Sequence, residues 1–404
     1  MHFYLFRKAI RKLPGDVIQK VPLPEPELTE GFGARSEIGR LCGKAGLKSV
    51  LLVTDRNIHG LCFHEKILDS LEENGISFAV FCDIDSEPTV DIIRKGRRAA
   101  AECGAECVIA LGGGSVMDSC KIIAASARHP KRSIRWYLQK FDFIPEKTLP
   151  IISVPTTAGT GAEYTVGAVI KNARGVKHST VIVGLNVQHV ILDSELMVNA
   201  PERVTVWCGI DALSHGLEGL LSDTRSGGED IRKSRECVKL VLENLPRVLE
   251  TPRDIEARQR MSLAAYYGGN AINKQLAGYV HAFAHSIGAL YHIPHGKAIA
   301  WCLVPVVEFQ SGICRDQLAA LAVYCGLAGA SASPEAAAGR FVSALRELLQ
   351  RCGLENGCKE LTEKDYPALV RMIDADSINY SPPKTLTDRE IRDLLDRIRK
   401  GEKE

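Results

Sequence analysis

The sequence predicts an α/β domain built on a parallel sheet, followed by an all-helical domain. Three observations support this prediction. The 404 residues exceed the size at which one hydrophobic core usually stops growing, so two domains are expected. Short β-branched runs alternate with helical stretches in the first half of the chain. After Pro201, apolar residues recur with the helical period and strand signals almost disappear.

The first half consists of successive strand-like and helical segments. The alternation is typical of βαβ units in a parallel sheet that is covered by helices on both faces. The strand-like runs are "KSVLLVT", "ISFAVFCDI", "CVIALGGG" and "TLPIISVPTT", and the helical stretches are "HEKILDSLEENG", "VDIIRKGRRAAAEC" and "VMDSCKIIAASA". The runs "VGAVIK", "HSTVIVG" and "HVILD" predict further strands before the helical half begins.

We expect three parts along the chain: an N-terminal arm at residues 1–30, the α/β domain at 31–197 and the helical domain at 198–404. The arm contains a basic, mildly amphipathic stretch at residues 3–20. We interpret it as a segment that packs against the protein or a partner rather than a membrane helix, because it is short and broken by Pro14-Gly15.

Composition excludes several classes of protein. The net charge is only +2 and charged residues are spread along the chain, which argues against nucleic-acid binding. The longest apolar runs are strand-sized, so we expect a soluble protein without a membrane span. Thirteen cysteines form no C-x-x-C pair, and an odd number in a long chain favours free thiols in a reducing cytoplasm.

A triple-glycine turn is the first candidate for cofactor binding. In "ALGGGSVMDSCK", Gly112, Gly113 and Gly114 follow a predicted strand and open a helix, where backbone N–H groups can approach a phosphate. The alternative is a tight strand-to-helix connection without a ligand. Asp118 and Lys121 can contribute to cofactor binding. Alternatively, Asp118 is a charge near the start of the helix and Lys121 is a solvated lysine.

Two further stretches of the α/β domain carry polar groups after predicted strands. In "VPTTAGTGAEYT" the hydroxyls of Thr156, Thr157 and Thr160 can bind a cofactor, or they can cap a turn of their own backbone. Asp55 ends "SVLLVTD". Its carboxylate can accept from ribose hydroxyls and repel a 2′-phosphate, which favours NAD over NADP, or it can serve ordinary turn chemistry.

The helical half contains the candidate metal ligands. Asp211 and His215 lie four residues apart in "GIDALSHGLEG", on one helix face. Four histidines follow in "GYVHAFAHSIGALYHIPHGKAIA". In one straight helix the first and last of these, His281 and His295, would lie about 21 Å apart. Gly288 and Pro294 permit a reversal, after which His295 would open a second helix.

The donor types indicate a transition metal. A carboxylate with two or three imidazoles suits Fe²⁺, Zn²⁺ or a similar divalent ion rather than Mg²⁺ or Ca²⁺. The residues alone leave the ligand set open, because the pair His281 and His285 is as plausible as the pair His281 and His295.

The motifs "GGGSVMDSCK", "TTAGTGAE", "GIDALSHGLE" and "HAFAHSIGALYHIPHG", in this order, resemble the iron-dependent (group III) alcohol dehydrogenase family, with support from "EPTVD" at 87–91. The similarity runs from about residue 31 to the C-terminus. It implies the dehydroquinate synthase-like fold, in which a Rossmann-like nucleotide domain precedes a helical metal domain and the site lies in the cleft between them.

The resemblance also implies roles for individual residues. His285 matches a histidine that lines the site without binding the metal. His292 matches no functional position, and we expect it to be packed or exposed. The implied metal ligands are Asp211, His215, His281 and His295. The implied cofactor residues are Asp55, Gly113, Gly114, Ser115, Thr156, Thr157, Thr160 and Lys177, to which we add Asp118.

Two positions depart from the family pattern. Arg35, in "GFGARSEIG", stands where a second small residue is common, and Gly167 replaces a polar residue that often contacts the nicotinamide ribose. Both departures concern the cofactor rather than the metal.

We therefore expect a metal-dependent alcohol dehydrogenase or aldehyde reductase that transfers a hydride between NAD(H) and a small primary alcohol or aldehyde, with His285 passing a proton towards solvent. The metal would be Fe²⁺, with Zn²⁺ or another divalent ion as the alternative, and a homodimer is favoured. Other readings are a glycerol-type polyol dehydrogenase, a dehydroquinate synthase-like lyase, and a non-catalytic assembly protein with a vestigial site.

Overall fold

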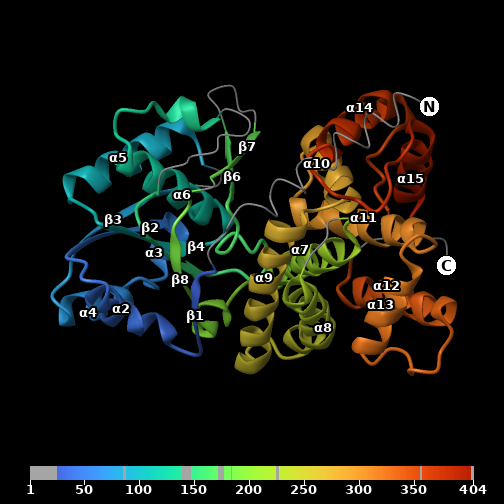
Figure 1. Ribbon diagram of the computed structural model, residues 1–404, viewed down its shortest axis with the longest axis horizontal. Coiled ribbons are helices and arrows are strands. Elements are labelled where there is room, and N and C mark those ends of the chain that lie inside the picture. The colour runs from blue at the N-terminus through green and yellow to red at the C-terminus, as the bar shows by residue number, and fades with distance from the viewer. Residues whose placement is uncertain are drawn as a thin grey trace. The chain divides into compact units, whose positions relative to one another are not determined.

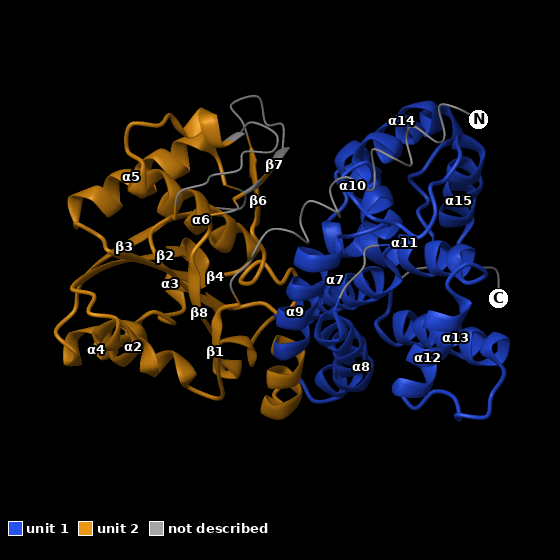
Figure 2. Cartoon of the chain, in the orientation of Figure 1, with its two compact units in different colours: residues 1–21, 201–252, 263–404 blue, residues 22–200, 253–262 orange. Residues whose placement is uncertain are grey.

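The computed structural model of the protein describes residues 25–84, 88–138, 147–171, 177–182, 184–223, 227–354 and 357–401. The chain forms two compact units (Figure 2). One contains residues 22–200 and 253–262, and the other contains residues 201–252 and 263–404. The amphipathic stretch at residues 3–20 lies outside the described residues, as does Glu87 of the "EPTVD" motif.

The first unit is built on a six-stranded parallel sheet with the order β1-β8-β5-β4-β2-β3. The five predicted strands that belong to this sheet are confirmed. The strand β1 was not predicted, and it lies within the stretch that we assigned to the arm. The bounds are β1 (Glu27–Glu30), β2 (Ser49–Asp55), β3 (Ser77–Ile84), β4 (Cys107–Gly112), β5 (Ile151–Pro155) and β8 (Val187–Leu192).

Helices cover both faces of this sheet, as the strand composition predicts (Figure 1). As a result, every residue from Val50 to Val53 of β2 is fully buried. Val50 and Leu52 pack in one core with Ile38 and Ile67. These two residues come from α2 (Ile38–Lys44) and α4 (Glu65–Glu73), while α5 (Val90–Glu102) and α6 (Gly114–Arg128) lie on the opposite side. The remaining predicted strands form the antiparallel pair β6 (Gly167–Lys171) and β7 (Lys177–Val181).

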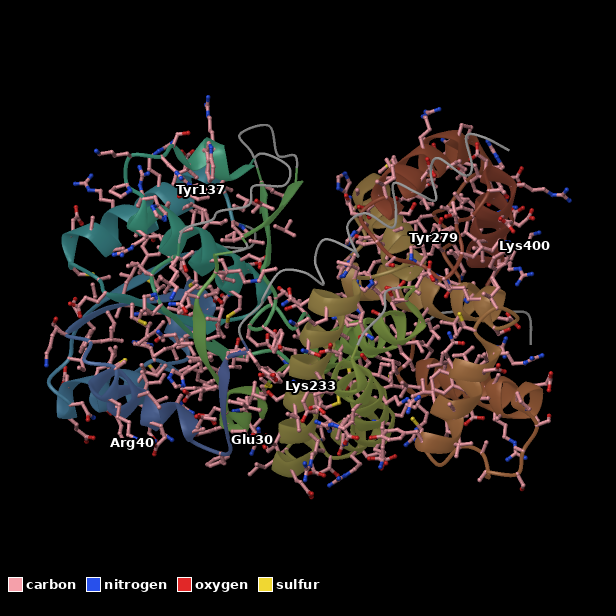
Figure 3. The ribbon with its side chains drawn as sticks, in the orientation of Figure 1. Glu30, Arg40, Tyr137, Lys233, Tyr279 and Lys400 are labelled. Carbon is pink, nitrogen blue, oxygen red and sulfur yellow. The ribbon has the colours of Figure 1, made fainter. Side chains whose placement is uncertain are left out.

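The second unit is helical, which confirms the prediction from the 3.6-residue period. Tyr279, labelled in Figure 3, is fully buried there, and its hydroxyl accepts a hydrogen bond from the Leu386 backbone N–H at 2.8 Å. The helices are α7 (Glu202–Leu221), α8 (Gly228–Glu250), α9 (Ile255–Gln275), α10 (Tyr279–Tyr291), α11 (His295–Gln310), α12 (Arg315–Tyr324), α13 (Pro334–Arg351), α14 (Tyr366–Ser377) and α15 (Asp388–Lys400).

The start of α9 belongs to the first unit rather than to the helical one. Gln259 explains part of this attachment, because its amide Nε2 donates to the Leu192 carbonyl at the end of β8, at 3.1 Å. No periodic pattern in the sequence indicates this contact. Among the described residues, no single helix is long and apolar enough to cross a membrane. One pair, α11 with α12, passes a length and composition test together but bends by 118°.

The predicted reversal between His281 and His295 is confirmed. α10 ends at Tyr291, His292 adopts a left-handed conformation with φ 56°, and α11 begins at His295 directly after Pro294. The helix continues through Gly288. The Gly288 carbonyl accepts the backbone N–H groups of His292 and Ile293, which satisfies the helix end.

A buried ion pair joins the start of the first unit to the end of its sheet. The Arg35 guanidinium contacts Asp193 Oδ2 at 2.6 Å and Glu195 Oε2 at 2.9 Å. Asp193 is fully buried, and its Oδ1 accepts the backbone N–H of Gly33 at 2.8 Å. The departure at position 35 is thus part of a structural network that ties the residues after β1 to those after β8.

We predict that Arg35→Ala lowers the free energy of unfolding by about 3–5 kcal/mol, because it leaves the buried Asp193 carboxylate without its cation. Urea denaturation of the purified protein measures this loss. Arg40→Ala is the control: Arg40 pairs with Glu37 on the surface, where both side chains are exposed, and should change stability by about 0–1 kcal/mol. Equal effects of the two substitutions would contradict the prediction.

Candidate metal centre and nucleotide-binding turns

Three helices supply the predicted metal ligands. Asp211 and His215 lie one turn apart on α7, His281 lies on α10, and His295 is the first residue of α11. Asp211 Oδ1 lies 3.3 Å from His295 Nε2, 3.5 Å from His215 Nε2 and 3.6 Å from His281 Nε2. The three predicted histidine ligands therefore lie around one oxygen of the fourth, Asp211.

The cluster fits a cation. Ligand atoms of Asp211, His281 and His295 all lie within 4.8 Å of one another. Asp211 Oδ1 and His281 Nε2 are buried and have no hydrogen-bond partner among the described residues. Such atoms are costly to bury unless something satisfies them. One carboxylate with three imidazoles is a donor set that suits Fe²⁺ or Zn²⁺.

Burial and charge shift the pKa values in this cluster. Burial alone would raise the pKa of Asp211, but the charges of His215 and His295 and the close approach of the His281 ring hold it well below its usual value. Burial would lower the pKa of His281, yet the charge of Glu218, its hydrogen bond to the ring and the nearby Asp211 carboxylate raise it to about 10. Asp211 is therefore ionised in the folded protein.

Glu218 is a site residue that our sequence reasoning missed. It is buried on α7, and its Oε2 lies 2.5 Å from His281 Nδ1 while its Oε1 accepts the Val280 backbone N–H at 2.6 Å. A signal was present in the sequence, because Asp211, His215 and Glu218 follow the i, i+4, i+7 pattern of one helix face.

His285 lies outside the ligand cluster, which fits the role implied for it by resemblance. Its Nδ1 lies 3.0 Å from both Asp376 Oδ2 and the Tyr380 hydroxyl, and its ring stacks on His295 with centroids 5.1 Å apart. Desolvation, and then the neighbouring His295, lower the pKa of His285 although Asp376 opposes them. No local pattern could have indicated Asp376 or Tyr380, which lie about 90 residues further along the chain.

His292 is exposed, as expected, and no contact between His292 and the four predicted ligands is found in the described part of the chain. Its left-handed backbone serves the reversal instead.

In the other unit, the triple-glycine turn packs against the threonine-rich turn. Gly113 caps α6, and a Cβ atom built on Gly113 would lie 3.4 Å from Thr157 Oγ1. A Cβ on Gly114 would lie 3.2 Å from Thr160 Oγ1. The Thr156 backbone N–H also donates to the Gly112 carbonyl at 3.0 Å. Two motifs that are distant in sequence thus form one surface at the start of α6, which includes Ser115.

Asp55 serves as the N-cap of the short helix α3 (Arg56–Gly60). Its Oδ1 accepts the backbone N–H groups of Asn57 and Ile58, both at 2.9 Å. The turn chemistry considered for Asp55 is therefore present, and it occupies one of the two carboxylate oxygens. Lys177 begins β7, but its side chain lies outside the described part of the structure.

Lys121 is buried, so its interpretation as a solvated lysine is wrong. Its Nζ donates to Asp118 Oδ1 at 3.2 Å, to Thr165 Oγ1 at 3.1 Å and to the Gly167 carbonyl at 2.5 Å. Asp118 Oδ2 accepts the Val169 backbone N–H at 2.9 Å. Both side chains thus attach α6 to β6, and burial raises the pKa of Asp118.

Glu163 is a buried acid that follows the threonine-rich turn. Only 2% of it is exposed, and its Oε1 has no hydrogen-bond partner among the described residues. Burial raises the pKa of this carboxyl to about 7. The Glu163 side chain is therefore largely protonated in mildly acidic solution.

Comparison with known proteins places both units in one family. Residues 26–194 match the family of iron-containing alcohol dehydrogenases, and residues 205–399 match the C-terminal domain of the Fe-containing alcohol dehydrogenase family. An NAD-dependent methanol dehydrogenase of Bacillus methanolicus is 30% identical over 92% of this chain and 97% of its own length.

Solved structures agree with these matches. A 1,3-propanediol oxidoreductase superimposes with a TM-score of 0.87 at 28% identity, over 94% of this chain and 99% of its own. A sulfoacetaldehyde reductase of Bifidobacterium kashiwanohense, solved in complex with NAD⁺, gives a TM-score of 0.85 at 27% identity, over 93% and 97% of the two chains. The expected combination of an α/β unit and a helical unit is confirmed.

We predict that the stability of the protein falls between about pH 4.5 and pH 7 through Glu163, because in this range the folded state holds a proton that the unfolded state has lost. Glu163→Gln mimics the protonated acid and should flatten this part of the profile by on the order of 3 kcal/mol. Urea denaturation at several pH values measures the difference. Glu73→Gln, at an exposed position, should leave the profile unchanged, and identical profiles for Glu163→Gln and the unmodified protein would refute the prediction.

Proposed function

The chain belongs to the iron-containing alcohol dehydrogenase family, and we propose that it transfers a hydride between NAD(H) and a small primary alcohol or aldehyde at a divalent metal ion. The observation that carries this proposal is the convergence of three imidazoles on Asp211 Oδ1. A vestigial site would have no reason to retain this unsatisfied buried cluster. The relatives named above carry dehydrogenase, oxidoreductase or reductase names, which favours redox chemistry over a lyase reaction.

We assign the metal to Asp211, His215, His281 and His295, with Fe²⁺ as the expected ion and Zn²⁺ or another divalent ion as the alternative. The cation supplies Lewis acidity, which stabilises negative charge on the oxygen of the alcohol or aldehyde. The chain contributes the fixed placement of these ligands on three helices, and the buried Asp211 carboxylate balances part of the positive charge.

His285 is the residue that we assign to proton transfer. Asp376 and Tyr380 both contact its Nδ1, so its Nε2 is the atom that can exchange a proton with substrate or solvent. Its lowered pKa suits this task, because the neutral ring can accept the proton that an alcohol loses. Its ring stacks on His295, which places it beside the ligand cluster.

The packed glycine and threonine turns support the cofactor proposal. Backbone N–H groups at the start of α6 suit the phosphates of a dinucleotide, and the threonine hydroxyls supply further polar groups. Asp55 keeps one carboxylate oxygen outside its capping bonds, which favours NAD over NADP. The assigned residues are Asp55, Gly113, Gly114, Ser115, Asp118, Thr156, Thr157, Thr160 and Lys177.

We place the protein in the cytoplasm as a homodimer. The thirteen cysteines, which all lie within the described residues, form no disulfide bond, which suits a reducing compartment. The family resemblance, rather than any contact in the structure, supports the dimer.

We predict that His281→Ala or His295→Ala removes bound metal and activity together, whereas His285→Ala retains the metal and slows turnover or changes its pH dependence. Metal analysis and NADH absorbance with a panel of alcohols and aldehydes measure both properties. His292→Asn is the matched control from the same segment, since asparagine tolerates a left-handed backbone. Full metal retention in His295→Ala would refute the ligand assignment.

We predict that Asp55→Asn shifts cofactor preference towards NADP. Asparagine still caps a helix, so the fold is preserved, but the negative charge that repels a 2′-phosphate is lost. The ratio of kcat/KM for NADPH to that for NADH should rise on the order of tenfold. Asp69→Asn, at an exposed position of α4, provides the control. An unchanged ratio at an unchanged thermal midpoint would show that Asp55 serves the turn alone.

A further inference from the structure

Glu218 is a buried carboxylate whose two oxygens hold two successive residues of another helix. Only 6% of it is exposed. From α7, its Oε1 accepts the Val280 backbone N–H at 2.6 Å and its Oε2 contacts His281 Nδ1 at 2.5 Å. Both contacts are made to the first turn of α10. No lysine or arginine forms an ion pair with Glu218 among the described residues, so its charge acts on the histidine.

These contacts determine which ring nitrogen of His281 is available. An ionised carboxylate has only acceptors, so His281 Nδ1 must carry a proton towards Glu218. The opposite nitrogen, Nε2, then faces Asp211 Oδ1 at 3.6 Å, a separation too long for a hydrogen bond. Glu218 thus fixes both the orientation of the ring and the nitrogen that it presents to the cluster.

A glycine makes room for this carboxylate. Gly278 immediately precedes α10, and a Cβ atom at this position would lie 2.7 Å from Glu218 Oε1 and 3.3 Å from its Cδ. Any larger residue would push the carboxylate out of its present position. The backbone before α10 and the side chain from α7 are therefore matched to each other.

We propose that Glu218 is a positioning residue of the metal centre, which holds His281 so that Nε2 is free to bind the ion. The proposal rests on the proposed function, because it concerns the same metal site. Hydrogen bonds of this kind from a carboxylate fix the orientation of ligand histidines and increase their basicity. Glu218 also adds a second negative charge, so that with Asp211 it balances a divalent cation in a buried site.

The geometry requires a carboxylate rather than an amide. In Glu218→Gln, one terminal atom is a carbonyl oxygen and the other is an NH₂ group. If the oxygen accepts from Val280 N–H, the NH₂ group faces His281 Nδ1 and forces the proton onto Nε2. If the amide is turned round, its NH₂ group opposes the Val280 N–H. The first arrangement keeps both hydrogen bonds but places a proton on the ligand nitrogen, and the second loses the hydrogen bond from the Val280 N–H.

The test compares metal affinity in the full-length protein. We expect Glu218→Gln to bind Zn²⁺ or Co²⁺ about 10–100-fold more weakly, measured by competition with a chromophoric chelator. The visible spectrum of the Co²⁺-loaded protein should change as well, because His281 is held differently. Glu229→Gln is the control: it makes the same chemical change at an exposed ion pair on α8 of the same unit and should leave both readouts unchanged.

A second variant leaves the charge of Glu218 in place. Gly278→Ala crowds Glu218 Oε1 and should also weaken metal affinity, which separates the position of the carboxylate from its charge. A purely structural role, in which Glu218 only satisfies the first turn of α10, would lower the thermal midpoint of the metal-free protein while leaving affinity unchanged. Wild-type affinity and an unaltered Co²⁺ spectrum in Glu218→Gln would overturn the inference. Failure of the unmodified protein to bind metal would instead refute the proposed function.

Discussion

The arrangement of the candidate metal centre depends on the ion pairs of the buried Asp211 carboxylate. An ionised carboxylate that is only 3% exposed is expensive to bury without positive charge or hydrogen-bond donors nearby. Within the described residues, Asp211 forms its ion pairs with histidines, which come from α7, α10 and α11. Three helices must therefore keep their places around one oxygen atom, and any movement among them changes the electrostatic balance of the site.

The reversal between α10 and α11 makes this convergence possible with very few residues. A continuous helix would separate His281 from His295 by about 21 Å, yet their ring centroids lie 5.5 Å apart. One left-handed residue, His292, and one proline, Pro294, produce the turn. The two elements are complementary, because Pro294 cannot continue the preceding helix and is well suited to starting the next.

Much of this organisation follows from local patterns in the sequence. Five of the six strands of the parallel sheet, the helical half, the turn at Pro294 and the pairing of Asp211 with His215 follow from periodicity and from the stereochemistry of proline, whereas β1 does not. The order in which the strands pair, the attachment of α9 through Gln259 and the partners of His285 depend on contacts between distant segments. Spacing alone left His285 and His295 equally plausible as partners of His281, because His295 can approach His281 only where the chain reverses.

Lys121 and Glu218 also show that contacts between distant segments cannot be predicted from local sequence. A lysine near a helix start is usually solvated, but Lys121 is buried because the residues before and within β6 supply oxygen atoms to its ammonium group. Glu218 could have been recognised from its helix face, but its partner could not, because Val280 and His281 lie more than 60 residues away. The surroundings of these two charged residues therefore depend on segments that approach them only in the folded chain.

His281 and His285 show how carboxylate partners can give two similar residues different roles. They lie one turn apart on α10, and each has a carboxylate oxygen at Nδ1, from Glu218 and Asp376 respectively. Glu218 is buried, and it holds His281 facing Asp211. Asp376 is partly exposed and shares His285 with the Tyr380 hydroxyl, so this ring retains access to solvent. The same side-chain chemistry thus supports the roles that we propose for the two rings: a fixed ligand on the buried side of the helix and a group that exchanges protons on the open side.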